Sequence, residues 1–194
     1  MFLEESFWIN EVLNKHAVDE LSPLLNIGSS SLRFREKVQP FIAENIFQPL
    51  AKKNIKVLHT DLQNEIGVDL VGDLADAKFV NQLKSMNFKS IICSNLLEHL
   101  EIETRLIVCT TLMNIINEGG LIVMTVPRIY PYHQDPIDTW YRPDAAELAG
   151  LFPGFKLIEK KYIRTETSFF SELKLRPMNV IFSKIKLFMI NCFK

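Results

Sequence analysis

Polar residues that could bind a ligand follow three apolar, strand-like runs near the start of this 194-residue sequence. The segment NIGSSS (26–31) closes the first run, Asp61 closes the second, and Asp73 follows the third. Glycine permits close backbone approach, and hydroxyls and N–H groups at a helix start suit an anion. A carboxylate can accept hydrogen bonds from ribose hydroxyls or from an exocyclic amine. These residue types together fit a ligand with an anionic group, a ribose and a base.

Each of these positions also has an ordinary structural explanation. The serines could cap a helix that follows a strand and a turn, and Asp61 could be a solvated loop residue. Asp73 could belong to the cap of a helix that begins near Asp76. The fourth run is followed by SNLLEHL (94–100), where the adjacent Glu98 and His99 cannot both easily point into one site. This segment could equally cap a helix.

A second group of reactive side chains lies in the loop 128–142, after the fifth apolar run. His133 is the natural candidate for a general base, because the pKa of histidine lies near working pH. Asp135 or Asp138 could orient His133 or replace it, and His99 is the rival base. The loop could instead be a structural lid, with His133 bonded to the backbone.

The same loop carries side chains suited to holding a substrate. Arg142 could bind an anionic group of an acceptor molecule. Aromatic rings with polar tips could form a pocket wall for a sugar ring or another small polar molecule. The candidates for this wall are Tyr130, Tyr132 and Trp140.

Strand-like runs alternate with helical patterns along the chain, which predicts an α/β fold with a mostly parallel sheet. The predicted strands are Ser22–Ile27, Ile55–Thr60, Val68–Val71, Ser90–Ser94, Leu121–Val126 and Phe155–Ile163. The predicted helices are 4–17, 33–53 with interruptions near Pro40 and Pro49, 76–86, 102–117 stopped by Gly119-Gly120, and 143–152. Ligands of such sheets bind at the carboxyl ends of the strands, where the polar residues fall.

Composition excludes several classes of function. The net charge of −1 argues against nucleic-acid binding. The 3 cysteines have no CxxC spacing, so neither a disulfide framework nor a metal site is expected. Cys93 and Cys109 are expected to be buried packing residues in a cytoplasmic protein. No apolar run is long enough to span a membrane. The sequence GSSSLR (28–33) lacks the glycines of a nicotinamide-binding loop, which argues against a reductase.

The order and positions of these segments resemble the class I S-adenosylmethionine-dependent methyltransferases, especially the methyltransferase type 11 group, from about Ser22 to Phe155. NIGSSS stands at the glycine-rich first motif and Asp61 at the acidic ribose position. GDL (72–74) stands at the adenine side, SNLLEHL at the LEH motif, and GGLIVMTVP (119–127) at strand five. The resemblance implies a Rossmann-like three-layer sandwich that binds S-adenosylmethionine, with an acceptor site above strands four and five. The cofactor-binding residues it implies are Asn26, Gly28, Ser29, Ser30, Asp61, Leu62, Asp73, Leu74, Asn95, Leu96 and His99.

The segment YPYHQDPIDTWYRP (130–143) is similar to a stretch of methyltransferases associated with bacterial surface polysaccharide synthesis, which favours a sugar, nucleotide-sugar or glycan acceptor. The first motif departs from the family, because it keeps only Gly28 and has Asn26 where an acidic residue is common. An alternative is therefore a catalytically silent member that acts as a scaffold subunit in surface-glycan assembly.

The methyltransferase domain is expected over residues 1–167, followed by an amphipathic segment over 168–194. Within it, residues 178–193 form a helical pattern with a wide apolar face and nearby basic residues. Such a helix could cover the sheet, pair with a second copy in a homodimer, or make peripheral contact with an anionic membrane surface.

Overall fold

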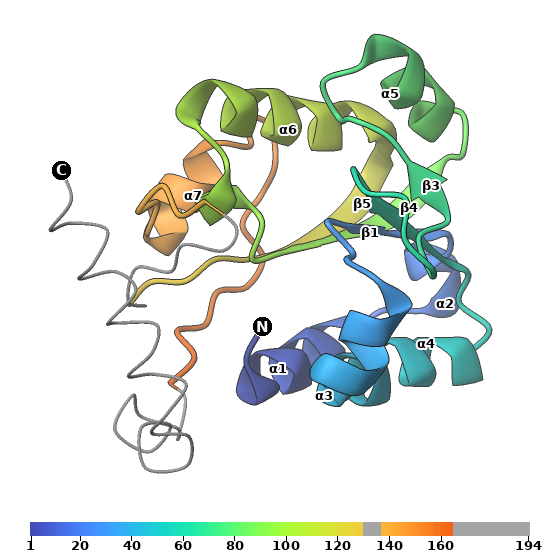
Figure 1. The fold of residues 1–194 in the computed structure, drawn as a ribbon. Helices are drawn as coiled ribbons and strands as arrows, with labels where there is room; N and C mark the ends of the chain where they lie inside the picture. The colour runs from blue at the N-terminus through green and yellow to red at the C-terminus, as the bar shows by residue number, and fades with distance from the viewer. Residues whose placement is uncertain (130–136, 165–194) are drawn as a thin grey trace, which may run out of the picture. The chain divides into compact units, whose positions relative to one another are not determined.

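The computed structural model describes residues 1–129 and 137–164 (Figure 1). The chain forms two compact units, Met1–Lys161 and Tyr162–Lys194, and every element described below belongs to the first unit. The amphipathic segment 168–194, with the membrane or dimer contact expected of residues 178–193, lies outside the described residues.

A five-stranded parallel sheet forms the middle of the first unit, in the order β3-β2-β1-β4-β5. The strands are β1 (Leu24–Ile27), β2 (Val57–Asp61), β3 (Leu70–Val71), β4 (Phe88–Ser94) and β5 (Ile116–Thr125). The chain winds outward from β1 to β3 and then crosses back to β4, so the point at which the strand order reverses lies between β1 and β4. The predicted parallel α/β sheet is confirmed.

Helices cover both faces of this sheet and give three layers. Figure 1 shows α1, α3 and α4 below the sheet and α5 and α6 above it. The helical segments are α1 (Leu3–Leu13), α2 (Val18–Leu21), η1 (Phe34–Val38), α3 (Pro40–Ile42), η2 (Ala43–Phe47), α4 (Gln48–Lys52), α5 (Ala77–Lys84), η3 (Leu97–His99), α6 (Ile102–Ile115) and α7 (Ala145–Gly150). The Rossmann-like three-layer sandwich is therefore confirmed.

The predicted helix 33–53 is interrupted at one of its two prolines. Gln39 leaves the helical region with φ −129° and ψ 70°, as expected of a residue that precedes proline. At Pro49 the helical backbone continues, since Phe47 and Gln48, which join η2 to α4, both have helical dihedrals. The expected interruption near Pro40 is confirmed and the one near Pro49 is wrong.

Gly119 and Gly120 lie inside β5, so the prediction that they stop the preceding helix is wrong. The helix α6 ends at Ile115, and β5 begins at the next residue. The β4–β5 register shifts between Phe88 and Ser90, and Gly119 there has φ +74°. A Cβ on Gly120 would lie 2.8 Å from the Lys89 carbonyl oxygen. The glycines therefore permit an irregular strand start, packed closely against β4.

No strand forms over 155–163, so the predicted sixth strand is wrong. Phe155, Leu157 and Ile158 are exposed, so this run has no buried face to turn toward a sheet. The segment contacts α1 and the residues that follow it instead: Lys161 Nζ lies 3.5 Å from Glu11 Oε2, and Lys15 Nζ lies 2.8 Å from Glu159 Oε2.

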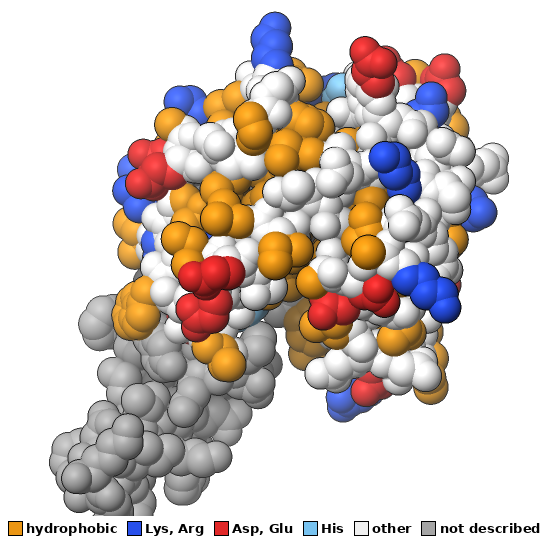
Figure 2. Space-filling view, turned by 90° about the horizontal axis from the view of Figure 1, so that it is seen from above, with side chains coloured by type: hydrophobic (Ala, Val, Ile, Leu, Met, Phe, Trp, Pro, Cys, Tyr) orange, Lys and Arg blue, Asp and Glu red, His pale blue; other side chains and the backbone are white. Residues whose placement is uncertain are grey.

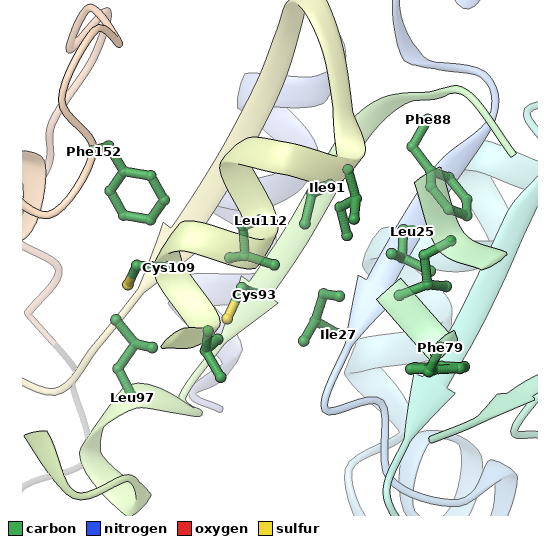
Figure 3. Packing of buried hydrophobic residues seen from close by; sticks show 13 residues of the cluster. Leu25, Ile27, Phe79, Phe88, Ile91, Cys93, Leu97, Cys109, Leu112 and Phe152 are labelled. Atoms are coloured by element: carbon green, nitrogen blue, oxygen red, sulfur yellow. The ribbon is translucent and has the colours of Figure 1, made fainter. Parts of the chain in front are cut away.

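The main hydrophobic core lies between the sheet and the layer of α5 and α6, and it fixes β1 against β4 (Figure 3). Leu25 and Ile27 of β1 are fully or almost fully buried in the same cluster as Leu112 of α6. The thiols of Cys93 and Cys109 are buried there and free. Burial raises the pKa of both, to about 11 for Cys109. Their expected packing role is confirmed.

The outer face of α5 and α6 carries hydrophobic side chains among charged ones (Figure 2). On α6, Ile102, Leu106 and Ile107 are exposed. Within residues 1–129 and 137–164, no helix is both long and apolar enough to cross a membrane.

Candidate functional site

Hydrogen bonds join the loop after β1 to the end of β2. The backbone N–H of Ser30 donates to Asp61 Oδ2 at 2.8 Å, and that of Ser29 donates to the Thr60 carbonyl at 3.0 Å. Asp61 Oδ1 accepts from the N–H of Gln63, and the Asp61 carbonyl accepts from Gly72 N–H. Three of the segments that the sequence predicted to bind the cofactor therefore meet at Asp61.

Arg35 of η1 donates hydrogen bonds to the backbone of the same loop, the one after β1. Its side chain is only 3% exposed. Nη1 donates to the carbonyls of Ser29 at 2.9 Å and Ser30 at 2.5 Å, and Nη2 donates to the Gly67 carbonyl at 2.7 Å. Sequence reasoning missed Arg35, because nothing in a helical pattern reveals that an arginine will bond backbone carbonyls of two separate loops.

Gly28 brings the β1 loop against the loop after β4. Its φ of +63° is in the region that glycine adopts without strain. A Cβ there would lie 3.2 Å from Cδ1 of Leu96, which follows β4. Gly28 itself is exposed, so a ligand can approach its backbone from outside.

Asn26 is bonded inside the molecule, at 6% exposure. Its Nδ2 lies 3.1 Å from Nδ1 of His59, the facing residue on β2. The amide nitrogen can only donate, so His59 Nδ1 accepts and the ring proton of the neutral form is on Nε2. Burial, and then the Arg35 charge, lower the pKa of His59 to about 4, so the ring is neutral at pH 7. The ring also packs edge-on against Phe47 at 4.7 Å.

Glu5 of α1 binds the ends of β4 and β5. Its Oε1 accepts from Ser94 Oγ at 2.9 Å, Asn95 Nδ2 at 2.7 Å and Thr125 Oγ1 at 2.5 Å. Its Oε2 accepts the N–H of Phe2 at 3.0 Å. Asn95, one of the predicted cofactor residues, has φ +49° and donates its own N–H to the Thr125 carbonyl. Glu5 was also missed, since one acid in an amphipathic helix carries no signal in sequence.

Residues 137–142, which we name the strap, cross over η3. The N–H and the hydroxyl of Thr139 both donate to the Glu98 carbonyl, each at 2.9 Å. Arg105 of α6 donates to Thr139 Oγ1 at 3.1 Å and to the Leu100 carbonyl at 2.7 Å. His99 Nδ1 lies 2.9 Å from the Ile137 carbonyl, so His99 contacts the strap.

The strap carries the predicted Asp138, Trp140 and Arg142. Asp138 is buried, and its Oδ2 lies 2.6 Å from Nη2 of Arg142. Asp138 Oδ1 accepts the N–H of Trp140 at 2.9 Å. Trp140 has φ +60° and an exposed ring. The Asp138 carboxylate is therefore already paired with a guanidinium.

Glu98 of η3 is the least satisfied acid of the site. It is 2% exposed, and its Oε2 has no hydrogen-bond partner. Burial raises the pKa of Glu98 to about 7, against the lowering effects of its own backbone N–H and of Arg142. The buried Nε of Arg142 also has no hydrogen-bond partner. The sequence singles out the LEH motif, but within that motif sequence reasoning favours His99.

The remaining residues that the sequence predicted for the site take no part in the hydrogen bonds described above. Asp73 is exposed, and its Oδ1 accepts the N–H of Ala75 at 2.8 Å. Leu62 is exposed, and Leu74 is half-buried. Those outside the described residues are Tyr130, Tyr132, His133 and Asp135. In the described part of the chain no group of three or more acidic, histidine or cysteine side chains could hold a metal ion.

Comparison by sequence finds no matching family model and no matching curated protein. Among solved structures, the fold is similar to one described as the crystal structure of a SAM dependent methyltransferase from Archaeoglobus fulgidus. The two chains are 14% identical, the match covers 92% of this chain and 86% of that chain, and the TM-score is 0.46.

Proposed function

We propose that this chain is an S-adenosylmethionine-dependent methyltransferase that acts on a small polar acceptor, with a sugar or nucleotide-sugar as the acceptor class. The observation that carries the proposal is the meeting of the predicted cofactor segments at one edge of the sheet. Asp61 bonds Ser30 at 2.8 Å, and a Cβ on Gly28 would lie 3.2 Å from Leu96. In parallel α/β sheets this edge, near the reversal of strand order, is where ligands bind.

The residues present fit the nucleoside half of the cofactor. Each Asp61 oxygen accepts one N–H and keeps a lone pair with which to accept from a ribose hydroxyl. Gly28 leaves its backbone open to close approach. Asp73 is exposed, so its carboxylate can accept from an exocyclic amine. Leu62 and Leu74 supply apolar surface for a base.

The chain's own part in catalysis is positioning. Bound S-adenosylmethionine supplies an electrophilic methyl group on a sulfonium. The Arg35 bonds and the Ser30–Asp61 bond fix the loop after β1, so that little reorganisation is needed on binding. Glu5 fixes the ends of β4 and β5, and the strap lies over η3. An acceptor would then lie on this second half of the edge, among Glu98, Asp138 and Arg142, with His133 and Asp135 as further candidates.

Calorimetric titration with S-adenosylmethionine and S-adenosylhomocysteine tests the proposal. The folded protein is expected to bind both at micromolar concentration. Asp61→Asn should weaken binding about tenfold, because its amide keeps one acceptor for the Ser30 N–H and loses the charge. Asp19→Asn is the control, since Asp19 is exposed on α2. If the folded protein binds neither ligand at high micromolar concentration, the proposal that it is a methyltransferase is refuted.

A catalytically silent binding subunit is the second candidate, and the donors of the first loop favour it. The N–H groups of Ser29 and Ser30 are both bonded within the chain, as is the N–H of Leu32, to the Ile66 carbonyl. Asn26 donates to His59, and the amide carries no charge to pair with the cofactor's ammonium. Cofactor binding without methyl transfer to any of a panel of sugars and nucleotide-sugars would support this candidate.

A further inference from the structure

Two complementary polar atoms are buried without partners on the strap side of the sheet edge. Glu98 Oε2 can only accept a hydrogen bond while the carboxyl is ionised, and Arg142 Nε can only donate one. A buried polar atom without a partner costs about 1–3 kcal/mol, and more for a charged group. Within the described residues only two other side-chain atoms share this condition, on Trp8 and Gln39. Both atoms belong to the part of the site where the strap bonds to η3, and the Arg142 charge acts on Glu98.

Both side chains are held in position by their other contacts. The Glu98 backbone carbonyl accepts two bonds from Thr139, which fixes the strap on η3. Arg142 is held by its 2.6 Å ion pair with Asp138, and its Nη1 donates to the Tyr141 carbonyl at 3.1 Å. The guanidinium is thus anchored through both terminal nitrogens, whereas its Nε has no hydrogen-bond partner.

The chemistry of the pair selects the kind of group that would complete it. A hydroxyl donates to a carboxylate and accepts from a guanidinium at once. A carboxylate would face the like charge of Glu98, and an ammonium ion would give Arg142 no acceptor. Of these three groups, only the neutral hydroxyl can bond to both atoms.

We propose that Glu98 Oε2 and Arg142 Nε form the subsite for the reacting hydroxyl of the acceptor, and that Glu98 takes its proton. In the transfer, an oxygen lone pair forms the bond to the methyl carbon and the S–CH3 electron pair stays on sulfur. The O–H bond breaks, and its proton goes to Oε2, from which it passes to solvent after product leaves. The transfer step, but not the hydroxyl subsite, rests on the methyltransferase function proposed above.

The charges around Glu98 suit this role. The Arg142 charge acts on it from the strap, and the Glu5 and Met1 amino-group charges act on it from the N-terminal segment. His99 Nε2 lies 3.9 Å from its Oε1. Burial outweighs these charges and sets the pKa of Glu98 at about 7. A proton acceptor works best when its pKa lies close to the operating pH.

Esterification by diazoacetamide tests the subsite without knowledge of the acceptor, because this small neutral reagent modifies protonated carboxyls. At pH 6.5 exposed carboxylates are ionised, so we expect Glu98 to be modified at least about tenfold faster than the exposed Glu118. Glu98→Gln should remove this label alone, and Glu118→Gln should leave it unchanged. If Glu98 is labelled in the unfolded chain but not in the native protein, its carboxyl is closed to small molecules. That result would overturn the proposal.

Glycerol, as a simple hydroxyl probe, tests the ligand class. We expect it to slow the labelling of Glu98 severalfold in the wild type and much less in Arg142→Lys, which keeps a charge for Asp138 but lacks Nε. Equal slowing in both proteins, or none, would refute the hydroxyl assignment. S-adenosylhomocysteine binding, measured in the same samples, should be within twofold for wild type and Glu98→Gln. Its absence from both would refute the methyltransferase and leave the labelling result on the subsite intact.

Discussion

The two halves of the carboxyl edge of the sheet differ in how completely their polar groups are bonded. On the β1–β2 half, Arg35 donates hydrogen bonds to three backbone carbonyls, and the Asp61 carboxylate accepts hydrogen bonds from two backbone N–H groups. On the β4–β5 half, Glu5 is fully bonded, but Glu98 Oε2 and Arg142 Nε are buried without partners. We name the first half the finished half, because its loops are bonded to one another within the chain. The second half, in contrast, keeps two buried polar atoms without partners.

This difference separates the two tasks that the proposed reaction requires. A loop that holds a cofactor gains from being rigid before binding, because ordering it then costs little free energy. A group that takes a proton must keep a free lone pair and a pKa near neutrality. Glu98 has both, whereas Asp138 is neutralised by Arg142. In the proposed reaction, cofactor binding would therefore fall to the first half and acceptor chemistry to the second.

The largest effect is expected from Arg35→Met, which would break the finished half. It leaves the carbonyls of Ser29, Ser30 and Gly67 without their donor. An unsatisfied buried group costs about 1–3 kcal/mol, and the bond to Ser29 is buried while those to Ser30 and Gly67 are part-buried, so the free energy of unfolding should fall by about 3 kcal/mol. Urea denaturation measures the change, with the exposed Arg33→Met as control. Equal losses in both variants would mean that the three bonds contribute nothing specific.

Glu98→Gln should stabilise the protein, and only at high pH. The pKa of Glu98 is about 7 in the folded state, above the ordinary 4.5. The native state therefore binds more protons than the unfolded state between these pH values, and stability falls as pH rises through them. The neutral amide of the variant would not carry this cost, so the variant should gain up to about 3 kcal/mol at pH 8 and little at pH 5. Urea denaturation at both pH values checks this, and a gain independent of pH would contradict it.

His59→Gln should show the opposite dependence on pH. The pKa of His59 is lowered to about 4 by burial and by Arg35, so the unfolded state binds the extra proton below pH 6.5. Stability from the neutral ring is complete above pH 6.5 and is lost as pH falls toward 4. The wild type should lose about 2 kcal/mol more than His59→Gln between pH 7 and pH 5. The glutamine amide can still accept from Asn26, and thermal unfolding across this range measures the difference. Parallel pH profiles would refute a buried neutral ring.

The sheet could be predicted from the sequence because its strands are short apolar runs that end in polar residues. The same reasoning failed at 155–163, where a run with several apolar residues was predicted to be a strand but Phe155 and Ile158 are exposed. It failed again at Gly119, where a glycine pair that suits a helix stop is part of an irregular strand. The local sequence pattern indicates which secondary structure a segment favours. It does not indicate which face of that segment other parts of the fold will cover.

The candidate site was predictable only where residues follow strands. Asp61 and Gly28 were found because strand order brings strand ends together. Glu5 and Arg35 were missed because their partners are remote: Glu5 bonds Thr125, 120 residues away, and Arg35 bonds Gly67, 32 residues away. Sequence reasoning did not select Glu98, because its distinguishing feature is a buried oxygen without a hydrogen-bond partner. No sequence motif indicates such a feature.

Gly28→Ala is expected to have the smallest effect on stability and gives the sharpest test of the first half. Gly28 and Gly119 both have positive φ, at +63° and +74°, so alanine at either should cost about 1 kcal/mol in unfolding free energy. Only at Gly28 would the new Cβ meet a neighbour, Cδ1 of Leu96 at 3.2 Å, whereas Gly119 has open space. Calorimetry should therefore show S-adenosylhomocysteine affinity reduced severalfold in Gly28→Ala and unchanged in Gly119→Ala. Unchanged affinity in both, at similar stability, would remove the β1 loop from the cofactor site and leave the bonds around Asp61 with a purely structural role.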